Sequence, residues 1–309
     1  MKNVFRIVMV FIGATVGAGF ASGQEIVSFF VNNGAFSWIG IIICSIIIGF
    51  FSFLSLELSR KNIHITNKFT RWIIAVYIIC GFVAMAAGSG ALLNQLVGLP
   101  IIVGVLIFLV VCVVILSFKS KGVVALNTYI TPIVIVGILV ICVYSFFNLS
   151  QGNVSINFPN RWAIPSLVYA SYNLLGIIPV FTNLKELSVS RKTNIIASAI
   201  ASILLCALLL MMWYILRNNY NSAEIPILNA FGNATRMIYA PILLFAMLTT
   251  AVSRGYAILS ITKIKIWQLV IIAIIVSFFS FSKIIEVGYS ICGWLGFWVL
   301  YNLLTKYRG

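Results

Sequence analysis

The residues with the clearest potential for chemistry lie near the start of the chain, in the glycine-rich stretch GATVGAGFASGQE at 13–25. Apolar residues flank it at 4–12 and 26–31. Four glycines within eleven residues predict that a membrane helix opens here. An opened helix exposes backbone groups, which a bilayer tolerates only where they are buried in protein or line a cavity. Broken helices form ligand and ion sites in many secondary transporters.

The chemistry expected of this stretch is the capture of an anion. If the helix opens between Val16 and Gly19, the half-helix that starts near Ala21 has free amides at its positively polarised end. Glycines let a carboxylate approach such amides closely. The candidates for binding a substrate carboxylate through the backbone are Gly17, Ala18, Gly19 and Phe20. The alternative is that the glycines serve close packing between membrane helices.

Two charged side chains fall within apolar segments, Glu25 and Arg254. An ionisable residue inside a membrane helix is costly and is a functional candidate by default. We expect Glu25 to act in proton coupling, in binding a cationic group or in the outer gate, unless it is a hydrogen-bonded structural residue. Arg254 is a candidate for coupling or for an inner gate, unless its guanidinium extends to the headgroups at the inner membrane surface.

The amino-acid composition of the chain indicates the environment in which these residues lie. Of the 309 residues, 62% are hydrophobic and 8% are charged, whereas a soluble domain has about a quarter charged residues. The chain is therefore predicted to be an all-α polytopic membrane protein with the lipid bilayer as its environment. The net charge of +15 does not indicate a nucleic-acid partner, because the basic residues are scattered through short loops. No constellation of His, Asp or clustered carboxylates suggests an enzyme.

Ten segments satisfy the requirement of roughly 20 apolar residues per span. With the N-terminus in the cytoplasm, the inner loops hold 15 Lys and Arg residues and the outer loops hold 4. This asymmetry predicts that both termini are cytoplasmic. The predicted spans are 5–31, 35–58, 71–96, 99–117, 123–147, 162–184, 194–216, 236–262, 265–281 and 284–304.

A second break is expected in the sixth span, at 171–179. Pro179 lacks an amide hydrogen and Gly176 loosens the same place. Breaks in spans one and six predict a 5+5 inverted repeat with halves at about 5–147 and 162–304, and corresponding broken segments indicate the binding site. Ordinary glycine and proline kinks are the alternative. The residues of this segment expected to contact the ligand are Ser171, Tyr172, Asn173 and Gly176.

The stretch 13–25, followed by Phe29, Phe30 and Gly34, resembles the first-helix signature of the YkvI-like bacterial membrane proteins. These belong to the amino acid–polyamine–organocation superfamily. The resemblance implies the leucine-transporter-type fold over essentially the whole chain and a location in the bacterial plasma membrane. A weaker similarity joins 248–252 to the branched-chain amino acid carriers of the same superfamily.

The resemblance also implies a cation site. In transporters of this fold, carbonyls of the unwound first span and two adjacent hydroxyls of the eighth span often coordinate sodium. The matching oxygens here are the carbonyls of Gly13, Val16 and Ala246 and the hydroxyls of Thr249 and Thr250. The alternative is that both hydroxyls bond to carbonyls of their own helix.

The function predicted from these observations is secondary active transport of a small organic solute by alternating access, with Na⁺ or H⁺ as the coupling ion. The free amides expected at the broken first span make an amino acid or a related carboxylate the expected substrate, whereas the resemblance implies little about it. Phe20 stands where related transporters carry an Asn of a second sodium site, so a single site is expected. The alternatives are a membrane sensor with a transport fold and a passive facilitator without ion coupling. The oligomeric state is left open.

Overall fold

The computed structural model describes residues 2–61, 67–148, 159–182, 185, 187–188, 190–262 and 264–308, and all regular secondary structure in these ranges is helical. Seven helical segments of this part are long and apolar enough to cross a membrane, and three shorter apolar helices accompany them. Together these ten segments correspond in order to the ten predicted spans.

The elements that form the first half are α1 (Lys2–Thr15), α2 (Ala18–Ser22), α3 (Gln24–Phe29), η1 (Val31–Asn33), α4 (Ser37–Arg60), α5 (Lys68–Val97), α6 (Ile101–Ser117) and α7 (Lys119–Asn148). Those of the second half are α8 (Ala163–Phe181), α9 (Arg191–Asn218), α10 (Pro226–Ala230), α11 (Asn233–Ile261), α12 (Ile266–Val276), α13 (Phe281–Lys283), the π-helical η2 (Ile284–Tyr289) and α14 (Ser290–Arg308).

The first span is broken where the glycine pattern predicts it. Helix α1 ends at Thr15 and α2 begins at Ala18, with Gly17 between them in an extended conformation. A second interruption separates α2 from α3 at Gly23, whose φ of 80° lies in the left-handed region that favours glycine. The chain therefore changes direction twice within the first span.

The break predicted in the sixth span at 171–179 is not found. Helix α8 continues through this segment to Phe181, with Pro179 inside it. Pro179 lies in the last turn, so the missing amide deprives only the Leu175 carbonyl of its intrahelical donor. The amide of Thr182 still bonds to the carbonyl of Ile178 at 3.0 Å, which keeps the final turn helical.

The helices pack in two groups. Helix α4 packs against α8 and α9, and α1 packs against the same two helices. In the second group α5 packs against α11, α6 and α12. The first span of the first half (α1) packs against the second span of the second half (α9). In the same way, the second span of the first half (α4) packs against the first span of the second half (α8). An inverted repeat produces this reciprocal pairing. The limits of the two halves, at 5–147 and 162–304, stay a prediction.

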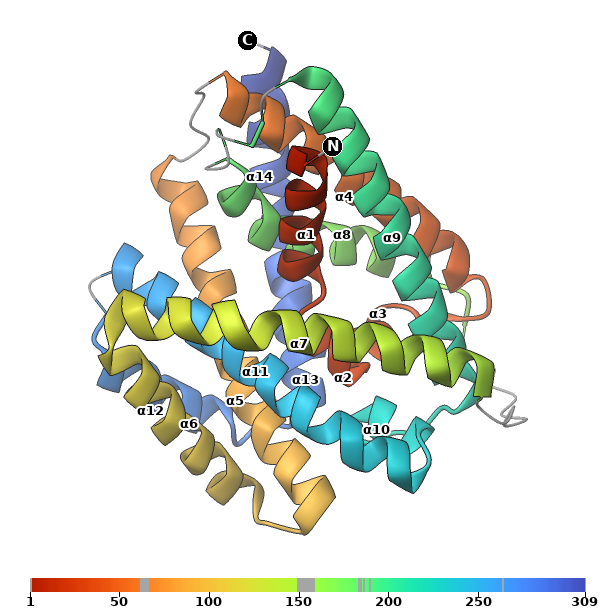
Figure 1. The fold of residues 1–309 in the computed structure, drawn as a ribbon, viewed down its shortest axis with the longest axis vertical. Helices are drawn as coiled ribbons and strands as arrows, with labels where there is room; N and C mark the ends of the chain where they lie inside the picture. The colour runs from red at the N-terminus through yellow and green to blue at the C-terminus, as the bar shows by residue number, and fades with distance from the viewer. Residues whose placement is uncertain are drawn as a thin grey trace.

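The remaining helices connect the groups. Helix α7 crosses in front of α11 (Figure 1), and α14 packs against α8. Both marked termini lie toward the upper end in the same view (Figure 1), as expected for an even number of spans. Their cytoplasmic location stays a prediction.

Candidate functional site

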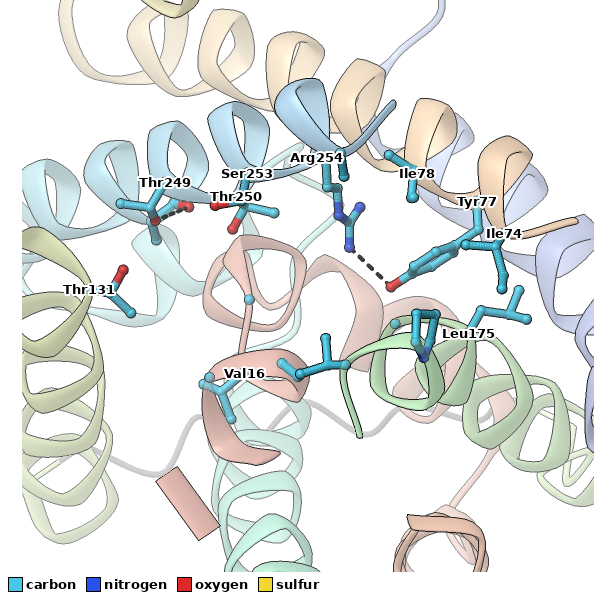
Figure 2. Close-up of a pocket in the computed structure, with 18 of the residues that line it drawn as sticks. Val16, Ile74, Tyr77, Ile78, Thr131, Leu175, Thr249, Thr250, Ser253 and Arg254 are labelled. Atoms are coloured by element: carbon cyan, nitrogen blue, oxygen red, sulfur yellow. Dashed lines mark hydrogen bonds between the residues drawn. The ribbon is translucent and has the colours of Figure 1, made fainter. Parts of the chain in front are cut away.

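A cavity of about 350 Å³ lies where the first span is broken. Its walls come from the end of α1 and from α5, α7, α8 and α11 (Figure 2). The cavity therefore lies between the two packed groups of helices. Most of the lining is apolar, and Ile74, Ile135, Leu175 and Val180 are representative.

The end of α1 supplies backbone groups to this cavity. Gly13, Val16 and Gly17 all line it. Because the helix stops at Thr15, the last carbonyls of α1 lack the amide partners that a continued helix would provide. A side chain at Gly17 would point at Thr250, whose Oγ1 lies 3.9 Å from the position of the missing Cβ. The opened backbone and α11 thus face each other closely.

Helix α11 presents its polar face to the same cavity, through Ala246, Thr249, Thr250, Ser253 and Arg254. The Thr249 hydroxyl bonds within its own helix, to the carbonyls of Phe245 at 3.0 Å and Ala246 at 3.1 Å. The Thr250 hydroxyl has no hydrogen bond to any described residue, which leaves it available to a ligand.

All five residues of the predicted cation site line this one cavity, although α1 and α11 are far apart in sequence. The structure adds Thr131 of α7, which lies across the space from Thr249 (Figure 2). Nothing in the sequence distinguishes Thr131 from any other threonine of an apolar helix. Cation binding at this place stays a prediction.

Arg254 points into the protein. Its guanidinium donates to the Tyr77 hydroxyl at 3.1 Å and to the Tyr289 hydroxyl at 3.2 Å, and it lies 4.9 Å from the centre of the Tyr77 ring (Figure 2). A Cβ at Gly81 would overlap Nη1, so this glycine provides the space that the guanidinium occupies. The alternative of an arginine extended to the membrane surface is therefore wrong.

Glu25 is buried, with 6% of its surface exposed. The Tyr172 hydroxyl donates to its Oε2 at 2.7 Å. A Cβ at Gly19 would overlap Oε1, so the protein's own carboxylate fills the space that this glycine leaves open. Glu25 does not line the cavity.

The remaining residues predicted to bind substrate lie apart from the cavity. Ala18, Gly19 and Phe20 are buried in α2, and of the candidates 17–20 only Gly17 reaches the cavity. The other three positions have no open space beside them, because Ala18 and Phe20 are fully buried and the carboxylate of Glu25 fills the room next to Gly19.

The candidates of α8 are likewise divided. The Asn173 amide donates to the Tyr169 carbonyl at 3.0 Å, and Ser171 is packed against Gly296 of α14. Tyr172 bonds to Glu25. Gly176 alone lines the cavity, opposite the Tyr77 hydroxyl. The unbroken helix turns the other three away.

Tyrosines join the two charged side chains, and sequence reasoning missed two of them. The rings of Tyr172 and Tyr289 lie 4.9 Å apart and those of Tyr77 and Tyr289 lie 6.4 Å apart. Tyr289 ends the π-helical η2, a type of segment that is frequent at functional sites. A tyrosine in an apolar span carries no local signal for this role, since its partners lie on other helices.

Across the described residues, no group of three or more His, Cys, Asp or Glu side chains could hold a metal ion. The charged group that lines the cavity is the Arg254 guanidinium.

No family model matches the chain. It is similar to two proteins of Bacillus subtilis (strain 168), the uncharacterized membrane protein YkvI and the uncharacterized protein YyaD. It is 24% identical to each of them over 97% of this chain and over 95% and 97% of theirs. The similarity to YkvI extends over nearly the whole of both proteins and agrees with the resemblance seen in the first span.

The fold is similar to crystal structures of mutants of the manganese transporter of Eremococcus coleocola. Two of them match with TM-scores of 0.60 and 0.62 at 10% and 9% sequence identity, over 97% of this chain and 77% of theirs. The chain thus shares the all-helical fold of these membrane transporters.

Proposed function

We propose that this chain is a secondary active transporter of a small organic solute that carries a carboxylate, most simply an amino acid. The observation that carries the proposal is the cavity at the break of the first span, in which a guanidinium and a free hydroxyl face a mostly apolar wall. We place the protein in the bacterial plasma membrane with both termini in the cytoplasm, and in the amino acid–polyamine–organocation superfamily with the leucine-transporter-type fold.

The lining fits a solute with one anionic end and one apolar end. Arg254 has five N–H donors, two of which bond to tyrosines. Those that remain can bind a carboxylate, which matches the planar geometry of a guanidinium. The apolar walls from α5, α7 and α8 then enclose the rest of the solute. The volume of about 350 Å³ suits a small metabolite.

Transport of a divalent metal is the second candidate, because the similar structures are manganese transporters. The chemistry of this cavity favours the organic solute. The charged side chain that lines it is a cation, which repels a metal ion, and hard divalent cations prefer several oxygen ligands that include carboxylates.

The coupling ion is Na⁺ or H⁺. Carbonyls at the end of α1 and the hydroxyl of Thr250 are neutral oxygen ligands of the kind that coordinates Na⁺ in broken-helix transporters. Arg254 lies one turn beyond Thr250 and brings positive charge to the same place. This charge disfavours a bound sodium ion and makes a proton the stronger candidate.

Counterflow in proteoliposomes tests the transport. The full chain, preloaded with unlabelled L-amino acids, is expected to accumulate the same amino acids in radiolabelled form with saturable kinetics. Gly17→Val is expected to abolish accumulation, because its side chain would enter the space in front of Thr250. Gly232→Ala is the matched control, because a Cβ there meets nothing within 4 Å.

The outcome separates the alternatives. Flux that never saturates and persists in Gly17→Val indicates a passive facilitator. Thermal stabilisation by an amino acid without any counterflow indicates a sensor. Stabilisation by Mn²⁺ and not by amino acids indicates a metal transporter. Each of these results would overturn the proposal.

A further inference from the structure

Two side chains of opposite charge, one acidic and one basic, lie in the predicted membrane spans and do not form an ion pair with each other. Glu25 lies on α3 and Arg254 on α11. Within the part of the chain that the structure describes, the one ion pair joins Arg60 to Glu57 at 2.8 Å. Both side chains are instead hydrogen-bonded to tyrosine hydroxyls. Glu25 accepts from Tyr172. Arg254 donates to Tyr77 and to Tyr289.

Between the two charges lie the rings of Tyr172 and Tyr289, which are buried and have centres 4.9 Å apart. Arg254 has one side toward the cavity and the other toward the tyrosines that cover Glu25. It is therefore the group that a solute in the cavity and the buried acid share. The titratable groups near this pair come from several elements: Tyr169 and Tyr172 from α8, Tyr289 from η2, Tyr77 and Cys80 from α5 and Cys292 from α14.

Charge balance permits two combinations at this place. With the cavity empty, an ionised Glu25 balances the Arg254 guanidinium. With a solute of net charge −1 bound to Arg254 through its carboxylate, balance requires a protonated Glu25. The other two combinations leave one net charge buried, which is unfavourable in a low-dielectric interior.

We infer that Glu25 carries the coupling proton and that Arg254 links this proton to the carboxylate of the solute. When Glu25 binds the proton, its negative charge no longer balances Arg254, and the guanidinium binds the solute carboxylate more strongly. Release of the proton therefore favours release of the solute, and release of the solute favours release of the proton. This inference rests on the proposed transport of a carboxylate-bearing solute, narrows that solute to one of net charge −1 and names its coupling ion. Because coupling between two sites is reciprocal, the solute must promote protonation of Glu25 as much as the proton promotes solute binding.

The glycines of the first span then have a different purpose from the one expected. Gly19 leaves room for the carboxylate of Glu25, and Gly23 makes the turn that brings α3 back toward α2. The anion held beside the glycine-rich break is a side chain of the protein. The solute carboxylate is bound on the other side of the tyrosines, at Arg254.

The test uses the full chain in proteoliposomes that contain a pH-sensitive dye. The probes are radiolabelled lactate and the radiolabelled amino acid L-glutamate, each of which carries a net charge of −1 at neutral pH. In the unaltered protein, solute uptake is expected to acidify the interior. Glu25→Gln is expected to exchange the solute still, at a rate that no longer depends on pH, while the acidification of the interior is lost, because the carboxyl group that carries the proton is gone.

Glu286→Gln serves as the matched control, because it neutralises an exposed acid of the last span outside this network. It is expected to keep both acidification and pH dependence. Acidification by Glu25→Gln that equals that of the unaltered protein would overturn the inference while leaving transport intact. If the unaltered protein exchanges neither lactate nor amino acids, the proposed transport itself fails and the inference fails with it.

Infrared difference spectroscopy gives an independent readout of the charge link. The carboxylic-acid band that disappears in Glu25→Gln reports the protonated form of that residue. Adding the exchanged solute at constant pH is expected to increase this band in the unaltered protein and to leave it unchanged in Arg254→Gln. A band that stays constant while the solute binds would show that Glu25 and the cavity are not linked.

Discussion

At the scale of single residues, each charged side chain of the site occupies room that a glycine on another helix leaves open, because the glycine has no Cβ. Gly81 accommodates the Arg254 guanidinium and Gly19 accommodates the Glu25 carboxylate. Each charged group is then bonded by tyrosine hydroxyls rather than by an opposite charge. This arrangement keeps both charges buried and leaves Arg254 able to bind a ligand.

Substitution Arg254→Lys is expected to raise the KM for the transported solute by roughly ten- to a hundredfold while kcat changes less, since losing one hydrogen bond to a charged group costs about 1.5–3 kcal/mol. A lysine ammonium has no planar pair of donors. It therefore cannot bond to a tyrosine and bind a carboxylate through two parallel hydrogen bonds, as a guanidinium does. Initial rates of uptake over a range of solute concentrations measure both constants. An unchanged KM would remove Arg254 from solute binding.

Substitution Tyr172→Phe removes the hydroxyl that donates to Glu25 at 2.7 Å. The buried carboxyl oxygen then lacks that donor, which is expected to lower the free energy of unfolding by about 1–3 kcal/mol. Chemical unfolding in detergent, followed by circular dichroism, measures the change. Tyr129→Phe is the control, because Tyr129 is 74% exposed, and it is expected to be neutral. Equal stability of the two variants would show that the Tyr172 bond contributes nothing.

At the scale of elements, the site lies where helices approach closely. Helix α5 packs against α11, and the small residue Gly81 is what allows Arg254 of α11 to fit between them. Helix α8 stays continuous past Gly176, and this glycine faces the Tyr77 hydroxyl of α5. The shape of the cavity is therefore decided by contacts between helices.

A methyl group at Gly81 tests this packing. In Gly81→Ala the new Cβ overlaps Nη1, so the guanidinium must leave its tyrosine partners, and the strain is expected to cost about 1–3 kcal/mol of stability. Counterflow is expected to be lost as in a variant without Arg254, whereas Gly232→Ala keeps it. Retained counterflow in a stable Gly81→Ala protein would show that the position of Arg254 is not needed.

At the scale of the whole molecule, the cavity lies between the two packed groups of helices, which the proposed transport requires to move relative to each other. Residues that line it come from the ends of α5, α8 and α11 that the charge pattern assigns to the cytoplasmic side. On the opposite side, the Gln95 amide of α5 donates to Asn229 of α10 at 2.7 Å. Alternating access requires this outer contact to open when the inner cavity closes.

Cross-linking tests that motion. Cysteines at Gln95 and Asn229, in a chain whose six native cysteines have been replaced, are expected to be joined by a short thiol-reactive cross-linker with a reducible linkage. The bridge is expected to stop counterflow, and a reducing agent is expected to restore it. Each single-cysteine variant controls for modification alone. Counterflow at the normal rate in the bridged protein would show that α5 and α10 do not separate during transport.

Local backbone chemistry determined much of this protein from sequence alone. Apolar length set the ten spans, and the glycines of 13–25 set the break of the first one, because a residue without a Cβ acts on its own backbone.

Long-range packing was needed for the rest. Pro179 failed to break α8 because it falls in the last turn, a place that depends on where the helix ends. Glu25 and Tyr172 are 147 residues apart, and Arg254 and Tyr77 are 177 apart. Which side chains share the cavity, which glycine receives which charge and which tyrosines separate them followed only from tertiary structure, because each depends on the meeting of helices that no local sequence pattern encodes.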